Sequence, residues 1–512
     1  MNNQAALLRG LIIGGVCLPL ALFLGYQLAT PEQFSSLFWV GVTFFAFLIP
    51  ILLRWHHPLL IIAWNLQFLV FFLPGHPQVF IVIAALSLTI SVASRMLRKD
   101  KTFISCPAVA YPLLALAVVT LATLYVRGVG AKAFGMSAWG AGRYAGVLGA
   151  IIGYFALTAQ PIPPNRAKWL AALFFLSGLT AAWPDLLNFA GPGFQELLAV
   201  LPSSLGTAIA TPSPLDPLER FVGFSIMATF FCYCMLMQFG IRGLLDWHRL
   251  WRLLSFAAVF AVGLLGGFRS QLGIFFILFL VQLGFERLYG TVVFSALLAV
   301  VVLTTLVVVP FSEDLPMSVQ RAISFLPVKI SPIVQQDATG TLDWRFSMWQ
   351  RALPDVPHYL LLGKGFAFDS TDLILAGYGM QHGLADSFED AMITDDYHQG
   401  ILPVIIPLGV WGFAVFLAFC WGGFRALYAN YCHGDPELLR INTFLLSLFV
   451  TQVLWYLFVY GEFYLDLMSM VGVVGLNLAL NNGVKKPAPA HRAAAVQQAG
   501  EPGVKLPAMQ PA

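Results

Sequence analysis

Long runs of apolar residues alternate with short polar segments along nearly the whole chain. A membrane-spanning helix needs about 20 mostly apolar residues, within a range of roughly 17–25. The pattern therefore predicts an all-α polytopic membrane protein with about 12 to 14 transmembrane helices, since two of the windows could be re-entrant segments. The candidate windows are residues 9–29, 36–53, 58–74, 78–94, 104–126, 143–160, 168–183, 219–240, 252–268, 271–289, 291–311, 400–420, 441–460 and 463–480.

The composition agrees with this fold class. Of the 512 residues, 59% are hydrophobic and 10% are charged, whereas a soluble domain carries roughly 25% charged residues. The net charge of +3 gives no indication of nucleic-acid binding. No small-residue cleavage site follows the first apolar run, so we expect a retained helix rather than a signal peptide. None of the six cysteines falls in a predicted outer loop, so no disulfide framework is expected.

One polar interruption is much longer than the others and divides the chain. Residues 1–311 hold the first eleven predicted spans, residues 312–399 form the long loop, and residues 400–480 hold the last three spans. Residues 481–512 are rich in Pro, Ala and Gln, which is typical of a disordered tail. A loop of this length is far beyond an ordinary connection, so we expect a small, partly helical subdomain.

Basic residues set the expected orientation. Short loops rich in Lys and Arg stay on the cytoplasmic side of a membrane, and the segments "RMLRKDK" and "IRGLLDWHRLWR" fit this rule. Both chain ends are then cytoplasmic and the long loop is periplasmic. Within that loop, "LDWRFSMWQRAL" has helical spacing of Leu342, Phe346, Trp349 and Leu353, which predicts an amphipathic helix at the membrane interface.

Arginines at the outer ends of two spans are candidate functional residues. Arg269 lies in the short hairpin "GLLGGFRSQLG", where glycines allow a ligand to approach and a guanidinium could bind phosphate oxygens. A snorkelling arginine that contacts lipid phosphate is the alternative. Arg220 begins another span on the same side, where it could simply pair with Glu219. Two such arginines together indicate an anion site.

A protic cluster, "TDDYHQG", directly precedes the span at residues 400–420. His398 in this cluster could act as a general base near neutral pH. Asp395 and Asp396 could orient the imidazole, or they could cap the helix that begins near Gly400. Asp396 and Tyr397 are also candidate substrate-binding residues.

Arg143, Arg345 and Lys364 complete the set of candidate substrate-binding residues, although a solvated or helix-pairing role is the default for each. Lys364 lies between two glycines, which suggests a turn that faces a ligand. Carboxylates before residue 400 could hold a divalent cation, but an acidic solvated surface is the preferred interpretation. Zinc is not expected because His358, His382 and His398 have no short spacing. We expect neither a metal nor a cofactor.

The segments "DWRFSMWQRALPDVPHYLLLGKGF" and "YHQGILPVIIPLGVWGF" resemble the O-antigen ligase and polymerase superfamily of bacterial inner membranes. The resemblance covers about residues 120–420 and is strongest at 342–413. One departure is Gln399, where the family often has asparagine. The resemblance implies transfer of a glycan from an undecaprenyl-diphosphate carrier to an acceptor hydroxyl at the periplasmic face.

By the same resemblance, Arg220 and Arg269 match the arginines that hold the diphosphate, and His398 matches the loop histidine that serves the acceptor. The partners implied are the lipid-linked glycan donor, a glycan or lipid acceptor, and membrane lipid. Ligase and polymerase are not separated by these motifs. A transporter or flippase of lipid-linked glycans is the alternative, but it predicts inverted repeats and charges near span midpoints, which are nearly absent here.

Overall fold

The structure is a computed structural model that describes residues 18–29, 34–70, 73, 76–97, 103–130, 138–190, 220–326, 328–381 and 388–487. Several sequence-based expectations fall outside these ranges: the first half of the span at 9–29, most of the loop at 184–218, the tail beyond residue 487, and the side chains of Glu219 and His382.

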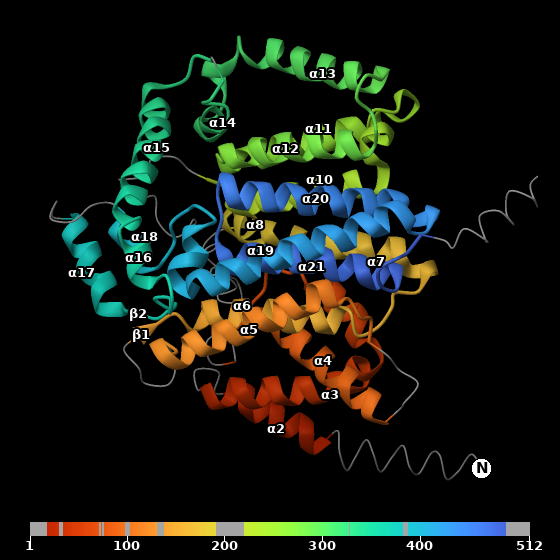
Figure 1. Ribbon diagram of the computed structural model, residues 1–512, viewed down its shortest axis with the longest axis vertical. Coiled ribbons are helices and arrows are strands. Elements are labelled where there is room, and N and C mark those ends of the chain that lie inside the picture. The colour runs from red at the N-terminus through yellow and green to blue at the C-terminus, as the bar shows by residue number, and fades with distance from the viewer. Residues whose placement is uncertain are drawn as a thin grey trace, which may run out of the picture.

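The described chain is almost entirely helical, which confirms an all-α polytopic membrane protein. In Figure 1 the long helices lie side by side in a stack. The stack extends from α2 at one edge to α13 at the other. Its helices, in chain order, are α2 (Leu18–Leu28), α3 (Phe34–Ala63), α4 (Val79–Leu97), α5 (Pro107–Arg127), α6 (Ala141–Leu157), α7 (Pro164–Leu176), α8 (Trp183–Ala190), α10 (Val222–Leu244), α11 (Trp251–Gly263), α12 (Arg269–Phe285), α13 (Val292–Val308), α19 (Leu402–His433), α20 (Leu439–Phe458) and α21 (Phe463–Asn481).

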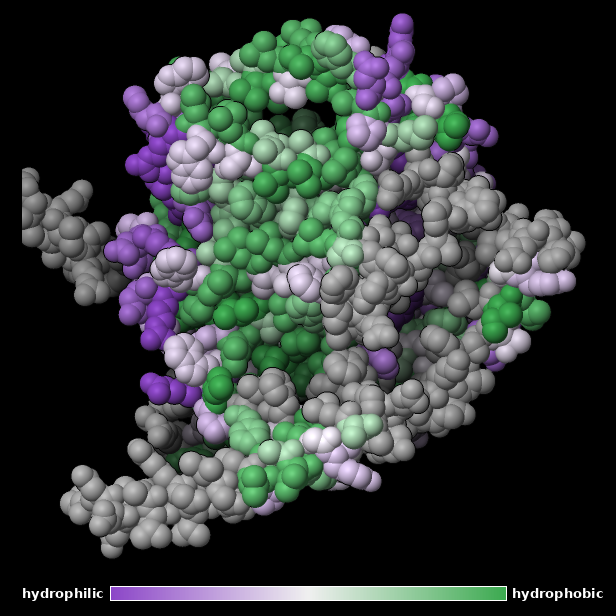
Figure 2. Space-filling model, turned by 180° about the vertical axis from the view of Figure 1, so that it is seen from behind, coloured by the Kyte–Doolittle hydropathy of each residue, from purple (hydrophilic) through white to green (hydrophobic). Residues whose placement is uncertain are grey.

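Seven helices of the described residues are long and apolar enough to cross a membrane, and five further apolar helices are shorter. Figure 2 shows apolar residues across the middle of one face, with hydrophilic residues gathered toward two opposite sides. Helix α13 has no buried residue, so its apolar side chains are available to lipid. These features are those of a multi-pass membrane protein.

The structure differs from the sequence pattern at the second and third windows. One helix, α3, runs from Phe34 to Ala63 through Pro50 and Pro58, and the residues after it are not helical. Polar groups explain the break: Asn65 Nδ2 donates to Phe174 O at 2.7 Å, and the Gln67 amide donates to Thr180 Oγ1 at 3.0 Å. The chain after α3 thus leaves the helical hydrogen-bond pattern and bonds in part to neighbouring segments.

The segment between α13 and α19 folds over one end of the bundle (Figure 1). Its elements are α14 (Met317–Ala322), α15 (Pro332–Ala352), α16 (Asp355–Tyr359), β2 (Phe368–Asp369), α17 (Ser370–Gln381) and α18 (Glu389–Ile393). Strand β2 pairs antiparallel with β1 (Ala138–Trp139), with Trp139 opposite Phe368. The long loop is therefore mostly helical and is joined to the bundle by a small sheet.

Helix α15 contains the predicted amphipathic stretch, and the structure shows which of its residues pack on the protein. Phe346 and Leu353 are exposed, whereas Met348 and Ala352 are buried in a small core of their own. Packing on the protein therefore uses a neighbouring face of the helix. The side chain of Leu342 lies outside the described residues.

Helix α19 is broken close to its beginning. Gly409 has a φ of 70°, which favours glycine, and Pro407 precedes it. The loop after α16 hydrogen-bonds to the groups that the break exposes: the Lys364 amide donates to Ile406 O at 2.8 Å and the Val410 amide donates to Leu360 O at 2.7 Å. The long loop and α19 thus share backbone hydrogen bonds at this point.

Candidate active site

A cavity of about 710 Å³ lies at the end of the bundle that the long loop covers. Arg220, Arg269 and His398, which the sequence predicts as catalytic, all line it, together with Arg345 from the predicted substrate-binding set. The complete lining is Arg220, Phe268, Arg269, Ser270, Gly273, Arg321, Phe325, Arg345, His398, Trp455, Val459 and Tyr460. Residues that are far apart in the sequence thus form one site.

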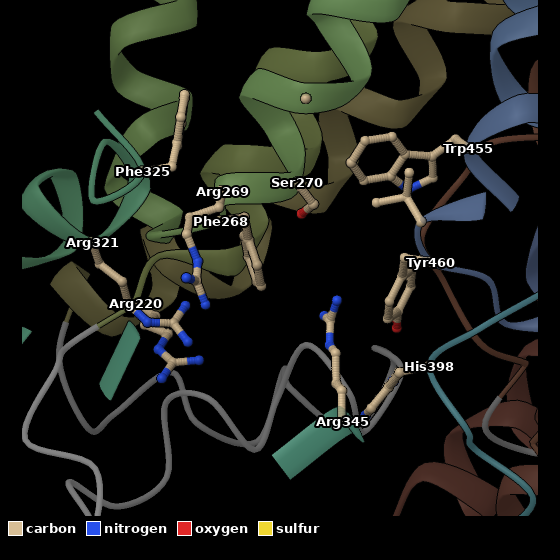
Figure 3. A pocket seen from close by; sticks show the side chains of 12 residues that line it. Arg220, Phe268, Arg269, Ser270, Arg321, Phe325, Arg345, His398, Trp455 and Tyr460 are labelled. Carbon is tan, nitrogen blue, oxygen red and sulfur yellow. The ribbon is translucent and has the colours of Figure 1, made fainter. Parts of the chain in front are cut away.

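Three arginines gather at one side of the cavity (Figure 3). Arg269 is the first residue of α12, and its Nη1 donates to Ala338 O at 3.0 Å. Arg321 is nearly buried and its Nη1 donates to Gly267 O at 2.9 Å. Gly267 has a φ of 69° and ends the 3-10 turn η6 (Leu264–Gly266), so this glycine allows the hairpin that presents Arg269.

A single carboxylate contacts this arginine cluster in the part of the chain that the structure describes. Asp337 forms an ion pair with Arg321 through Nε, and its Oδ1 lies 3.9 Å from Arg220 Nη2. Positive charge therefore exceeds negative charge around the cavity. An arginine remains protonated in proteins and can bind phosphate or carboxylate oxygens in pairs.

Arg345 reaches into the cavity from α15, on the side of His398 and Tyr460 (Figure 3). Its guanidinium lies 5.7 Å from the centre of the Tyr460 ring, and its buried Nε has no hydrogen-bond partner among the described residues. Burial lowers the pKa of Arg345, and the nearby charge of Arg321 lowers it further. The site thus holds a fourth guanidinium with unused donor capacity.

His398 is held in place by aromatic rings and a carboxylate. Its ring lies between Tyr460, at 5.4 Å between centroids, and Trp344, at 5.3 Å. Its Nδ1 lies 3.2 Å from Asp396 Oδ1. The carboxylate therefore lies on the Nδ1 side of the ring, although the two atoms do not have the geometry of a hydrogen bond, and Nε2 is the other ring nitrogen. Burial would raise the pKa of Asp396, but His398 and Arg143 outweigh it, so the pKa lies below its ordinary value.

The two aspartates beside His398 have different roles, and neither caps the following helix. Helix α19 begins after Ile401 without a side-chain cap. Asp395, at a φ of 58°, and His398, at a φ of 50°, adopt the left-handed conformation that side chains rarely take. This tight turn directs Asp396 toward His398 and Asp395 toward Lys364. Strain of this kind is common at functional sites.

Lys364 and Tyr397, two of the predicted substrate-binding residues, do not line the cavity. Lys364 Nζ lies 2.8 Å from Asp395 Oδ1, and the Tyr397 hydroxyl donates to the same oxygen at 2.9 Å. Burial raises the pKa of Asp395, and the charge of Lys364 opposes this rise. Trp349 Nε1 also donates to Tyr397 O at 2.8 Å. The structure therefore places both residues in a cluster of contacts around the buried Asp395 carboxylate, next to the His398 turn.

Arg143 lies at the beginning of α6, also behind His398 and not in the cavity lining. Its guanidinium is 5.9 Å from the centre of the Tyr464 ring. Its positive charge helps to lower the pKa of Asp396, and it opposes the rise that burial causes in the pKa of Glu462. Arg143 therefore acts on the site through neighbouring charges.

Several residues that the structure brings to the site were not among the candidates from the sequence. Arg321 and Asp337 lie within the long loop, where no apolar run gives them a position. Tyr460 precedes Gly461 and Glu462, the polar pair between two adjacent apolar runs, and this interruption was the available signal. Trp344 was contained in the predicted amphipathic helix without an assigned role.

No group of three or more His, Cys, Asp or Glu side chains within the described ranges is arranged to hold a metal ion. Asp386, one of the loop carboxylates, lies outside those ranges. Asp395 and Asp396 contact Lys364 and His398 instead of converging on one point.

A comparison with protein families matches residues 253–417 to the family described as O-Antigen ligase. The matched segment runs from α11 into α19 and contains Arg269, Arg321, Arg345 and His398. No curated protein matches the chain. The match supports an enzyme with ligase or polymerase activity on glycans. The chain carries a segment that matches the O-Antigen ligase family within a multi-pass membrane fold, and this match supports membership of the O-antigen ligase/polymerase superfamily.

Proposed function

We propose that this protein transfers a glycan from an undecaprenyl-diphosphate carrier to an acceptor hydroxyl at the periplasmic face of the bacterial inner membrane. The observation that carries the proposal is the cavity that places four arginines and His398 at one end of an apolar bundle. A donor of this class has a long apolar tail and a diphosphate, so its reactive end lies where the membrane meets water. A cavity at the end of an apolar bundle fits such a donor.

The charges of the cavity fit the leaving group of this reaction. The bond between the sugar and the diphosphate breaks as the acceptor oxygen attacks the anomeric carbon, and the diphosphate leaves with the electron pair. Arg220, Arg269 and Arg321 would stabilise the negative charge that develops on it, because fixed cations are most effective in a site shielded from water.

His398 would take the proton from the acceptor hydroxyl. The Asp396 carboxylate lies on the Nδ1 side of the ring, so Nε2 would be the nitrogen that accepts the proton. The same carboxylate would stabilise the imidazolium that forms. The stacked ring of Tyr460 and the tilted ring of Trp344 limit the rotation of the imidazole. Arg345 would bind the donor between the histidine and the other three arginines.

The position of basic residues supports a periplasmic cavity. Helix α10 begins beside Arg220 at the cavity and ends beside Arg242, which is followed by Arg249 and Arg252. The basic cluster therefore lies at the opposite end of this helix from the site. Since short basic loops stay cytoplasmic, the cavity end of the bundle would face the periplasm.

The test uses the purified protein in lipid nanodiscs with an undecaprenyl-diphosphate glycan and candidate acceptors. We expect formation of a glycosylated acceptor and release of undecaprenyl diphosphate, and we expect His398→Ala and Arg269→Ala to abolish both without unfolding the protein. His358→Ala is the matched control, because this exposed histidine lies on α16 outside the cavity.

Normal transfer by either site variant would overturn the site assignment. Reconstitution in vesicles separates the alternative class: movement of the lipid-linked glycan across the bilayer without any transfer to an acceptor would indicate a transporter and would overturn the proposed function.

A further inference from the structure

The N-terminal half of α15 already contacts the arginine cluster through two consecutive residues. Asp337 pairs with Arg321 and approaches Arg220, while the carbonyl of the next residue, Ala338, accepts from Arg269. All three arginines that would hold a diphosphate therefore have a contact on one turn of α15. This turn therefore contacts guanidinium groups that an anion would also use.

The carboxylate of Asp337 resembles the expected ligand in its chemistry. Its two oxygens contact two different guanidiniums, Oδ2 that of Arg321 and Oδ1 that of Arg220. Carboxylate and phosphate oxygens match the same donor geometry of arginine, so the two anions compete for the same groups. A diphosphate carries more negative charge than one carboxylate and would displace it from Arg220 first, where the separation is 3.9 Å.

The number of arginines also creates a difficulty for turnover. Four guanidiniums that stabilise the transition state also bind the diphosphate product, and tight binding of a product slows its release. An internal anion that returns to the arginines as the product leaves lowers the affinity for that product. Asp337 is placed for this role, and about a third of its side chain is exposed, so it can move between the two states.

We propose, on the basis of the proposed function, that Asp337 is an internal competitor for the arginine cluster and sets the affinity of the site for the donor and for the diphosphate product. Asp337 is a positioning residue and takes no part in bond making. Its carboxylate pairs with Arg321 when the site is empty. When the donor binds, the diphosphate replaces this carboxylate as the partner of Arg220.

The test compares Asp337→Asn with the wild-type protein by calorimetric titration with inorganic pyrophosphate and by steady-state transfer kinetics. Removal of the competing charge should tighten pyrophosphate binding by roughly tenfold at low salt, since the pair is partly exposed. It should also lower KM for the donor and lower kcat together. The gain should shrink as the ionic strength rises, because salt screens exposed charges.

Two further neutralising changes complete the design. Asp343→Asn removes an exposed carboxylate from the same helix, away from the cavity, and should leave pyrophosphate binding and both kinetic constants unchanged. Asp337→Gln removes the same charge with a side chain of different shape and should reproduce the tighter binding. If one of the two variants does not fold, the other still tests the role of Asp337.

The outcomes separate this inference from the proposed function. If wild-type protein binds pyrophosphate, Arg269→Ala loses that binding, and both neutral variants at residue 337 bind no more tightly than wild type, the role of Asp337 is wrong and the anion site stands. Weaker binding by the neutral variants would also overturn it, because it would mean that Asp337 only orients the arginines. Absence of pyrophosphate binding by the wild type would overturn both.

Discussion

Two groups of charged residues lie close together at the same end of the molecule, and they are built in opposite ways. Around the cavity, Asp337 is the one carboxylate of the described residues that forms an ion pair with any of the four guanidiniums, and the cavity has a volume of about 710 Å³. Behind the His398 turn, the single ammonium of Lys364 meets Asp395, and the Tyr397 hydroxyl fills the remaining position on the same oxygen. Asp395 and Tyr397 are 3% and 1% exposed.

The difference shows how a binding site can be separated from a structural ion pair. A matched pair whose hydrogen bonds are filled by its neighbours has nothing left to offer a ligand. An excess of one charge around an open volume, with donors still unused, requires a counter-ion from outside. The arginine cluster is therefore a candidate binding site, whereas Lys364 and Asp395 form a structural ion pair.

Among substitutions in these two groups of residues, Arg345→Met at the cavity should have the largest effect on the rate of glycan transfer. Loss of one fixed cation beside a developing charge should lower the transfer rate by roughly a hundredfold to a thousandfold. The melting temperature should change little, because the guanidinium has a buried, unbonded Nε and forms no ion pair among the described residues. The measurements are initial rates of glycan transfer and thermal unfolding of the purified protein.

Arg351→Met is the control, since it removes an exposed arginine from the end of the same helix, where the guanidinium lies over the Phe388 ring. Equal losses of activity from both variants would mean that α15 is sensitive to any change, and the comparison would fail.

Lys364→Met should affect stability instead of chemistry. Removal of one partner leaves the Asp395 carboxylate buried without its cation, which costs about 3 kcal/mol or more of unfolding free energy. Thermal or denaturant unfolding should show the loss, and the protein that stays folded at low temperature should still transfer glycan. A large drop in activity with unchanged stability would instead place Lys364 among the substrate-binding residues.

Asp396→Asn tests the carboxylate beside His398, which lies in the chain between the cavity-lining His398 and the Lys364–Asp395 pair. A contact with a charged partner is worth about 1.5–3 kcal/mol, so its loss should slow transfer by roughly tenfold to a hundredfold. The fold should persist, because Trp344 and Tyr460 still hold the His398 ring. Kinetics that match those of wild type would remove Asp396 from the mechanism.

Glu462→Gln gives the smallest effect, a change in how stability depends on pH. Burial raises the pKa of the Glu462 carboxyl above its ordinary value of 4.5, and the negative charge of Asp396 raises it further. The folded state thus binds this proton more tightly than the unfolded state, so its contribution is complete below pH 4.5 and is lost as the pH rises through the folded-state pKa. Melting temperatures measured across that range should decline less in the variant.

Glu437→Gln is the matched change on an exposed carboxyl at the opposite end of α20, beside the 3-10 turn η8 (Pro436–Leu438), and it should leave the pH profile as in wild type. A profile altered equally by both changes would argue against a special environment for Glu462.

Much of this fold could be predicted from the sequence because apolar length is a strong signal in membrane proteins. The signal failed at residues 58–74, where Asn65 and Gln67 bond to neighbouring helices and stop a helix that hydropathy alone would continue. Hydropathy averages over a window and does not register one or two polar groups with a partner elsewhere in the fold.

The site was predictable where a charge adjoins an apolar run and not elsewhere. Arg220, Arg269 and His398 each lie next to a span, were candidates from the sequence, and line the cavity in the structure. Arg321 reaches the cavity only because the Gly267 carbonyl and Asp337 hold it there, and such contacts between distant segments leave no local pattern. Lys364 had the right flanking glycines, but the partner that closes it off lies about thirty residues later in the chain.

The hydrogen bonds between the long loop and the break in α19 set a limit on exchanging parts between related enzymes. The Lys364 amide donates to the Ile406 carbonyl, and the Leu360 carbonyl accepts from the Val410 amide. The first two turns of α19 therefore depend on the loop for their backbone hydrogen bonds. A chimera designed to change the acceptor should therefore be cut after Val410. A cut near residue 400 would join a foreign loop to a helix whose gap was shaped by another sequence.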